Sequence, residues 1–194
     1  MKRGLISSVF AALMLFSGLS QARDLPVIAA EVGTPVLQEL MGGCSLKCAF
    51  PWETSAVVPG KSPQPVYTLD DDDAATVWID PSESPGTRLV FQFPKKLPKE
   101  LNGTPFYGFD IIDGNLKSEA LFKAYARLKK VKLYYNGKPF CLVTFSDTRH
   151  WQHVLFEDID AKQGDVFAME ILEVYPGAKF PNAALTELVL QGAH

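Results

Sequence analysis

The segment VKLYYNGKPFCLVTF, residues 131–145, restricts the fold more than any other stretch of this chain. Two runs rich in β-branched and aromatic residues flank the dipeptide Asn136-Gly137. Asn-Gly readily supplies the two positive-φ residues of a type I′ turn, and this turn matches the twist of paired strands. The segment therefore predicts an antiparallel β-hairpin.

Other short runs along the chain have a similar strand-like composition and are bounded by Pro, Gly and Asp residues. Their number and spacing are typical of sandwiches and barrels. One segment differs, since Leu121, Phe122 and Tyr125 have helical spacing within residues 117–129. We expect an all-β sandwich with one short helix. The predicted strands outside the hairpin are residues 87–93, 106–112, 153–156, 166–174 and 184–190.

An acidic stretch, LDDDDAATVWID at residues 69–80, has four consecutive aspartates. Like charges this close repel one another unless they are solvated, held in capped turns or neutralised by a cation. The oxygen-rich pattern Asp71-x-Asp73-x-x-Thr76 suits Ca²⁺, although it lacks the spacing of an EF-hand. The alternative is a solvated acidic loop in which Trp78 packs into the core.

The N-terminus has the pattern of a secretory signal peptide. Lys2 and Arg3 precede an apolar run over residues 5–19, and small residues follow at 20–22. The apolar run is shorter than the ~20 residues that a membrane span needs. We therefore expect residues 1–22 to be removed and the protein to be secreted or periplasmic.

The mature chain would have 172 residues and a formal charge of −5, from 17 basic and 22 acidic residues. This length suits one domain. An acidic chain with scattered lysines is a poor nucleic-acid binder. We expect no membrane span in the mature chain, because no second long apolar run follows.

Cys44 and Cys48 lie in CSLKC, within a segment that we expect to be an irregular lead-in over residues 23–63. In an oxidising compartment, a disulfide between Cys44 and Cys48 is favoured over two free thiols. Zinc is disfavoured, because a structural site needs four ligands. Cys141 lies in a strand-like run and is predicted to be a buried thiol.

Three stretches together resemble a known family. Residues 69–78 resemble the D-G-D-x-x-T-x-W signature of discoidin-like domains, which are also called F5/8 type C or galactose-binding-like domains. Residues 113–131 resemble the N-G-Y-x-K-S … F … R-x-K block of one branch of that superfamily. Residues 174–188 resemble its V-Y-P-G-x-K-Y … S-E-I terminus. That branch is the NADase-type glycan-binding or translocation domain of secreted NAD glycohydrolase toxins, which also occurs alone in bacterial secreted proteins.

The resemblance implies a discoidin-like jelly-roll β-sandwich, here over residues 64–194, that binds a ligand and catalyses no reaction. In related carbohydrate-binding modules the acidic loop and a C-terminal Glu bind structural Ca²⁺. Carried over to this chain, the metal ligands are Asp71, Asp73, Thr76 and Glu187. The family's Gly between the two acidic positions is replaced by Asp72.

Several side chains are candidates for binding a ligand. Trp151, Tyr107 and Tyr134 could stack on the apolar face of a sugar, or they could pack in the core. Lys117 and Arg127 belong to the main concentration of basic residues, which is either a solvated face or a surface for an anionic glycan or lipid headgroup.

We recognise no catalytic motif in the sequence, such as Gly-x-Ser-x-Gly, His-Glu-x-x-His or a glycine-rich phosphate loop. The first functional hypothesis is a non-catalytic module that recognises a glycan or another cell-surface ligand through loops at one end of the sandwich. The alternative is an accessory protein that binds a secreted protein partner. Structural Ca²⁺ is the one cofactor that we expect.

Overall fold

The computed structural model describes residues 24–35, 46, 52–71, 73–83, 85–97, 99 and 102–192. The predicted signal peptide and the predicted Cys44–Cys48 disulfide lie outside these residues. The elements are β1 (Val27–Ala29), β2 (Glu31–Pro35), β3 (Glu53–Val57), β4 (Gln64–Pro65), β5 (Trp78–Ile79), β6 (Arg88–Gln92), β7 (Thr104–Asp113), α1 (Glu119–Ala124), β8 (Arg127–Tyr135), β9 (Lys138–Thr144), β10 (His150–Ala161), β11 (Val166–Tyr175) and β12 (Ala184–Gly192).

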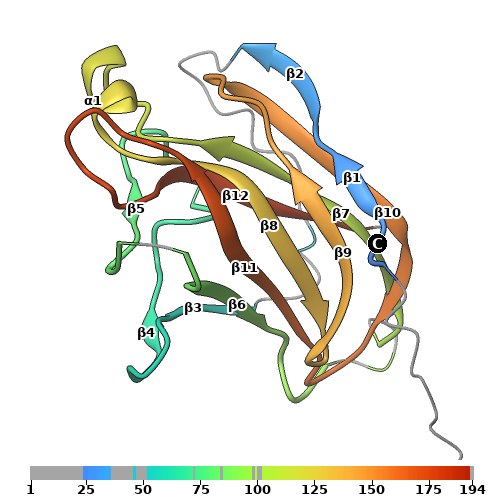
Figure 1. Cartoon of the computed structure of the whole chain (residues 1–194). Helices are drawn as coiled ribbons and strands as arrows, with labels where there is room; N and C mark the ends of the chain where they lie inside the picture. The colour runs from blue at the N-terminus through green and yellow to red at the C-terminus, as the bar shows by residue number, and fades with distance from the viewer. Residues whose placement is uncertain are drawn as a thin grey trace, which may run out of the picture.

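The strands form two sheets that pack face to face (Figure 1). The order of the seven-stranded sheet is β1-β9-β8-β11-β6-β3-β4, and that of the five-stranded sheet is β2-β10-β7-β12-β5. All pairs are antiparallel except that of β1 with β9. The fold is therefore the expected β-sandwich with one short helix.

The predicted hairpin is present between β8 and β9. Asn136 and Gly137 have φ values of 48° and 76°, the left-handed conformation that a type I′ turn requires at both positions. The strands pair from Tyr135 and Lys138 to Lys130 and Thr144, with one irregularity near Tyr134. This prediction is confirmed.

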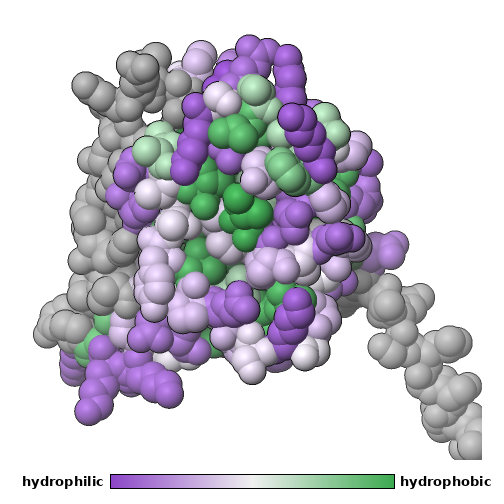
Figure 2. Space-filling view, turned by 90° about the vertical axis from the view of Figure 1, so that its left-hand side faces the viewer, coloured by the Kyte–Doolittle hydropathy of each residue, from purple (hydrophilic) through white to green (hydrophobic). Residues whose placement is uncertain are grey.

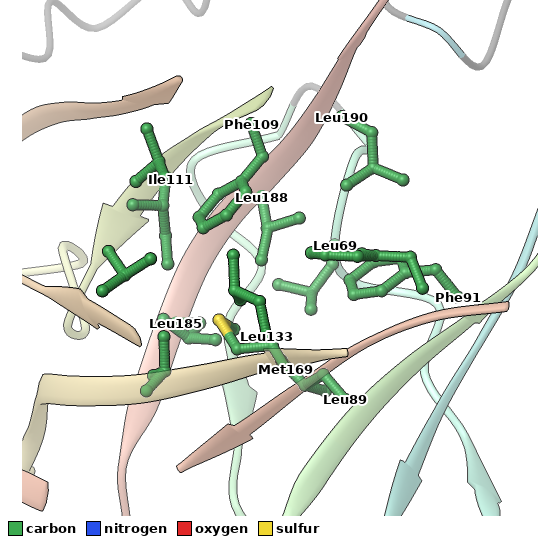
Figure 3. Close-up of a cluster of buried hydrophobic side chains, with 14 of the residues drawn as sticks. Leu69, Leu89, Phe91, Phe109, Ile111, Leu133, Met169, Leu185, Leu188 and Leu190 are labelled. Atoms are coloured by element: carbon green, nitrogen blue, oxygen red, sulfur yellow. The ribbon is translucent and has the colours of Figure 1, made fainter. Parts of the chain in front are cut away.

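The core lies between the sheets and consists of side chains from alternate positions of the long strands (Figure 3). Phe106 and Phe109 of β7 contact Phe167 of β11, with ring centroids 5.1 Å and 6.1 Å apart. Cys141 is buried as predicted, and burial raises the pKa of its thiol to about 12. Leu69 also belongs to this core, so it fixes the start of the acidic stretch against the sandwich.

The sandwich begins earlier than residue 64. β1 pairs with β9, β2 pairs with β10 and β3 pairs with β6, so three strands lie inside the segment that we expected to be irregular. β1 and β2 are short and have no alternation of buried and exposed residues, which removes the usual signal for a strand. They occupy neighbouring edges of the two sheets and join them (Figure 1).

The helix α1 follows β7 and has six residues. Ser118 caps its N-terminus by accepting a hydrogen bond from the Leu121 backbone N–H at 3.1 Å. Phe122, on the buried face of the helix, packs against Gly114. A Cβ added at Gly114 would lie 2.6 Å from the Phe122 ring. Within the described residues, no helix is long and apolar enough to cross a membrane.

Candidate functional site at one end of the sandwich

Four loops meet at one end of the sandwich, which we call the loop end. β7 finishes there at Asp113, and the paired strand β12 begins there at Ala184. β8 begins and β11 finishes at the same end. The loop end consists of residues 80–87, 114–126, 145–149 and 176–183, and α1 marks it in Figure 1.

The acidic stretch forms capped turns. The Thr76 hydroxyl donates to the Asp71 carboxylate at 2.8 Å, and the Asp73 backbone N–H donates to it at 3.1 Å. The Ala75 N–H donates to the Asp73 carboxylate at 2.8 Å. Capped turns are therefore one of the ways in which this stretch accommodates its neighbouring aspartates. Three of the four predicted metal ligands, Asp71, Asp73 and Thr76, lie together in these turns.

Glu187, the fourth predicted ligand, lies beside this stretch on β12. Its Oε1 accepts hydrogen bonds from the backbone N–H groups of Asp70 and, at 3.1 Å, of Leu188. Its Oε2 is buried and has no hydrogen-bond partner in the described part of the chain. Burial raises the pKa of Glu187 to about 7, against those two hydrogen bonds, and the charges of Asp71 and Asp70 add to the increase.

These groups fit a cation only in part. Glu187 Oε2 is a buried carboxyl oxygen that lacks a partner among the described residues, and the charge of Asp71 acts on this carboxyl group. However, no group of three or more His, Cys, Asp or Glu side chains in the described residues is arranged to hold a metal ion. The Ca²⁺ site therefore stays a prediction.

Two further buried carboxylates, which sequence reasoning missed, fix the loop end. Asp113 Oδ1 accepts the Leu128 N–H at 3.0 Å and so joins the end of β7 to the start of β8. Asp80 Oδ1 accepts bonds from the hydroxyls of Ser82 and Thr87 at 3.0 Å and 2.9 Å. Burial raises the pKa of both carboxyls, most strongly that of Asp113. The partner of Asp113 belongs to another element, β8, whereas Asp80 is bonded within its own loop, where sequence spacing gave no sign that its carboxylate would be buried.

Arg127 has a structural role at this end. Its guanidinium forms a bidentate pair with the Asp147 carboxylate at 3.0 Å and 2.7 Å. It also donates to the backbone oxygens of Tyr125 and Pro176 at 2.8 Å and 3.2 Å, and it lies over the Phe122 ring. Because these contacts use four of the five guanidinium N–H groups, the geometry favours loop anchoring over direct contact with a ligand.

Lys117 is exposed on the loop before α1, close to a basic residue that the sequence analysis did not select. Arg149 donates to the Leu116 oxygen at 3.4 Å and lies over the Phe122 ring at 5.9 Å. The loops of residues 114–126 and 145–149 therefore present cationic side chains together. No sequence spacing links Lys117 with Arg149, because the two loops meet only in the fold.

An aromatic pair lies at the same end. The rings of Tyr125 and Phe180 have centroids 4.6 Å apart and an interplanar angle of 30°. Phe180 is 40% exposed, which is unusual for a phenylalanine of a sandwich with a large core. Gly177 allows the close approach of these two loops, because a Cβ there would lie 2.4 Å from the Tyr125 backbone.

The other predicted ligand residues are dispersed. Tyr134 lies on the outer face of the seven-stranded sheet, donates to Glu170 and is covered by the Arg88 guanidinium 4.5 Å from its ring. Trp151 is half-buried near the start of β10, and Tyr107 is half-buried towards the opposite end of β7. The five predicted residues therefore do not form one site.

His153 lies two positions after Trp151 on β10, and no group of three or more His, Cys, Asp or Glu side chains in the described residues could hold a metal ion there. His153 Nδ1 instead lies 2.7 Å from Asp110 Oδ1, and Gln191 donates to the other oxygen of that carboxylate at 3.0 Å. Gly33 of β2 leaves room for this ring, because a Cβ there would lie 2.2 Å from His153 Nε2.

Two packed β-sheets with one short helix place the chain in the class of discoidin-like β-sandwiches. The chain belongs to the family of NAD glycohydrolase translocation F5/8 type C domains, whose model matches residues 55–191. A comparison with curated proteins finds no match.

Solved structures of similar fold include carbohydrate-binding modules of Clostridium perfringens ZmpB. Its CBM32-1 and CBM32-2 domains in complex with GalNAc have a TM-score of 0.55 and 12% identity, over 88% of this chain and 41% of that one. The same domains with the M60 catalytic domain give a TM-score of 0.52 and 13% identity, over 90% of this chain and 17% of that one. The chain spans less than half of these structures, and the likeness shows the fold alone.

Proposed function

We propose that this protein is a non-catalytic module that recognises a glycan or another cell-surface ligand through its loop end. The observation that carries the proposal is the partly exposed Tyr125–Phe180 pair beside the cationic loops of Lys117 and Arg149. An aromatic face suits the C–H face of a pyranose ring, while exposed cations donate to hydroxyl, amide or anionic groups. The family and the fold of sugar-binding modules support this choice.

The buried carboxylates and Arg127 support this role by holding the loops in place before a ligand arrives. Asp113 fixes the start of β8, Asp80 fixes residues 80–87, and Arg127 joins three loops through Tyr125, Asp147 and Pro176. A preformed site loses less conformational entropy on binding, so modest contacts give useful affinity.

A glycan array with the protein expressed from residue 23 tests the proposal. We expect retention of a limited set of glycans, and loss of that binding in Phe180→Ala and Lys117→Ala. Lys138→Ala, at the opposite end beside the hairpin turn, is the matched control and should bind normally. Folded protein that retains no glycan, or equal binding by Phe180→Ala, would contradict the proposal.

We also propose a structural Ca²⁺ at the acidic stretch, held by Glu187 with oxygens of Asp71, Asp73 and Thr76. Support comes from the buried Glu187 Oε2, which lacks a partner among the described residues, and from the oxygen-rich turns beside it. A hard cation prefers such carboxylate and hydroxyl oxygens and would offset the cost of burying an ionised Glu187.

A specific observation supports the alternative of a protein partner. Val27, Val32 and Leu155 are 61%, 44% and 60% exposed on β1, β2 and β10, the strands at and beside one edge of the sandwich. An exposed apolar edge strand is a surface to which another chain can add. Pull-down from periplasm or culture fluid that returns a stoichiometric partner, lost in Val27→Lys, would favour this function.

A secreted or periplasmic location remains part of the proposal. β1 begins at Val27, only a few residues after the predicted cleavage at residue 22, so the mature N-terminus would start almost directly in the sheet. N-terminal sequencing of exported protein tests the cleavage point.

A further inference from the structure

A groove lies beside β3 and β4, at the lower left of Figure 1. Its volume is about 530 Å³, within the range of ~300–1,000 Å³ that is usual for small-molecule sites. The side chains that matter here are those of Trp52, Glu53, Ser55, Pro65, Tyr67 and Gln92. Figure 2 views this side of the molecule and shows apolar side chains surrounded by hydrophilic ones.

The groove is separate from the loop end. Glu53 pairs with Gln92, whereas Val57 and Arg88 form the other end of the same strand pair, next to loop 80–87. Ligands at the two places would therefore contact different residues. A site in the groove goes beyond the function proposed above.

The walls of the groove are rigid. Gln92 Nε2 donates to the backbone oxygens of Gly164 and Asp165 at 3.0 Å and 3.3 Å. Trp52 is buried against Phe93, with ring centroids 6.4 Å apart. Pro65 has a fixed φ angle, which restricts the β4 side. A cavity with such walls can hold a ligand without first ordering its own side chains.

Tyr67 lies at the groove and is 81% exposed, the largest exposure among the large hydrophobic residues described. The fold does not explain this exposure, because burying the ring would remove apolar area from water. An accessible aromatic ring beside a polar groove is the arrangement that stacks on the C–H face of a sugar ring.

The charge of the groove limits the kind of sugar. Glu53 contributes a carboxylate, and Ser55 contributes a hydroxyl. Among the described residues that line the groove, none is Lys, Arg or His. An anionic sugar would be repelled by the Glu53 carboxylate, whose charge no cation in the groove lining compensates. The hydroxyls of a neutral sugar can instead donate hydrogen bonds to this carboxylate.

We propose that this groove is a second carbohydrate site, which takes a neutral pyranose ring. The Tyr67 ring stacks on the face of the sugar ring. The Glu53 carboxylate accepts hydrogen bonds from sugar hydroxyls, and the Ser55 hydroxyl forms a further hydrogen bond with the sugar. The protein therefore contacts glycans at two places, with cationic residues at the loop end and an anionic residue in the groove.

NMR of ¹⁵N-labelled protein from residue 23 tests the proposal through the tryptophan indole N–H signals. The probes are methyl glycosides of galactose, glucose, mannose, GalNAc and GlcNAc, with N-acetylneuraminic acid as the anionic comparison. We expect at least one neutral glycoside to shift the Trp52 signal. Tyr67→Ala should weaken that binding roughly tenfold, since the lost stacking is the main contact. The exposed position of Tyr67 means that this variant should fold normally.

Two further variants separate the alternatives. Phe180→Ala should leave the Trp52 shift unchanged, even if it abolishes binding at the loop end. Glu53→Gln should let N-acetylneuraminic acid shift the Trp52 signal, because the repelling charge is gone. A Trp52 signal unmoved by all five neutral glycosides, or equal affinity in Tyr67→Ala, would overturn the proposal. Tighter binding of N-acetylneuraminic acid than of neutral glycosides by the unmodified protein would also overturn it.

Discussion

At the scale of single residues, Glu187 is a predicted metal ligand whose carboxyl group is buried. It is 1% exposed, and its Oε2 lacks a partner among the described residues. Its pKa of about 7 means that ionising it in the metal-free fold costs free energy. The folded state therefore binds a proton more tightly than the unfolded state does.

In chelator, we expect Glu187 to make stability fall as pH rises. A raised pKa in the folded state contributes stability below the unfolded value of about 4.5, and this contribution is lost as pH rises through about 7. The loss should be on the order of 3 kcal/mol. Asp80 and Asp113 also have raised pKa values, so the test is the difference between wild type and Glu187→Gln in urea unfolding from pH 4 to 8. Parallel pH profiles would contradict this prediction.

Calcium should reverse that effect. Binding to the native state alone raises stability by RT ln(1 + [L]/Kd), so Ca²⁺ should raise the melting temperature by several degrees at neutral pH. The increase should vanish in Glu187→Gln and in Asp71→Asn, and it should persist in the control Asp158→Asn on β10. Differential scanning calorimetry in Ca²⁺ and in chelator measures it. Equal melting temperatures in Ca²⁺ and in chelator would mean that hydrogen bonds alone hold the turns of the acidic stretch, without a metal ion.

At the scale of elements, Arg127 joins the loops on which ligand binding would depend. It begins β8, and its guanidinium contacts the loops that contain Asp147 and Pro176. Its place in a basic run led to the prediction that it contacts the ligand. Its partners are distant in sequence, so only the fold shows that its hydrogen bonds are internal.

Arg127→Ala should destabilise the protein by about 3 kcal/mol, since it leaves two partly buried backbone oxygens and Asp147 without their partner. Arg88→Ala, at an exposed ion pair with Glu170, should cost less than about 1 kcal/mol. Chemical unfolding measures both. A purely ligand-binding Arg127 would give the opposite pattern, with unchanged stability and lost binding.

At the scale of the whole molecule, β1 and β2 close one edge of the sandwich. β1 completes the seven-stranded sheet and β2 completes the five-stranded one, although only Ala30 separates them. Ala30 itself donates to the Thr144 oxygen at 2.9 Å. The segment therefore holds the two layers together at this edge.

Removal of residues 23–35 should expose the edges of β9 and β10 together. We expect a lower melting temperature and concentration-dependent association, because unpaired strand edges template further pairing. Size-exclusion chromatography with light scattering measures association, and Val27→Ala with Val32→Ala is the control that keeps both strands. A truncated protein that stays monomeric, with an unchanged melting temperature, would contradict this prediction.

How much could be read from the sequence depended on the range of the interactions. The hairpin, the helix and the strands β6, β7, β11 and β12 were predictable, because their turns and alternation are local. The five short strands before residue 80 were not, since each has two to five residues and depends on a partner far along the chain. The predicted Ca²⁺ ligands came from neighbours in the sequence and from the family resemblance, and Ca²⁺ binding by them stays a prediction.

The sequence by itself determined the β-sandwich class, the hairpin at Asn136-Gly137, the buried thiol of Cys141 and the resemblance to the family. These follow from backbone preferences and from hydrophobic patterning that each segment carries alone. Only the tertiary structure decided that Arg127 is an anchor, that Tyr125 meets Phe180 and that Tyr67 stands exposed over a groove. Each of these depends on loops or strands from distant parts of the chain, which come together only when the two sheets pack.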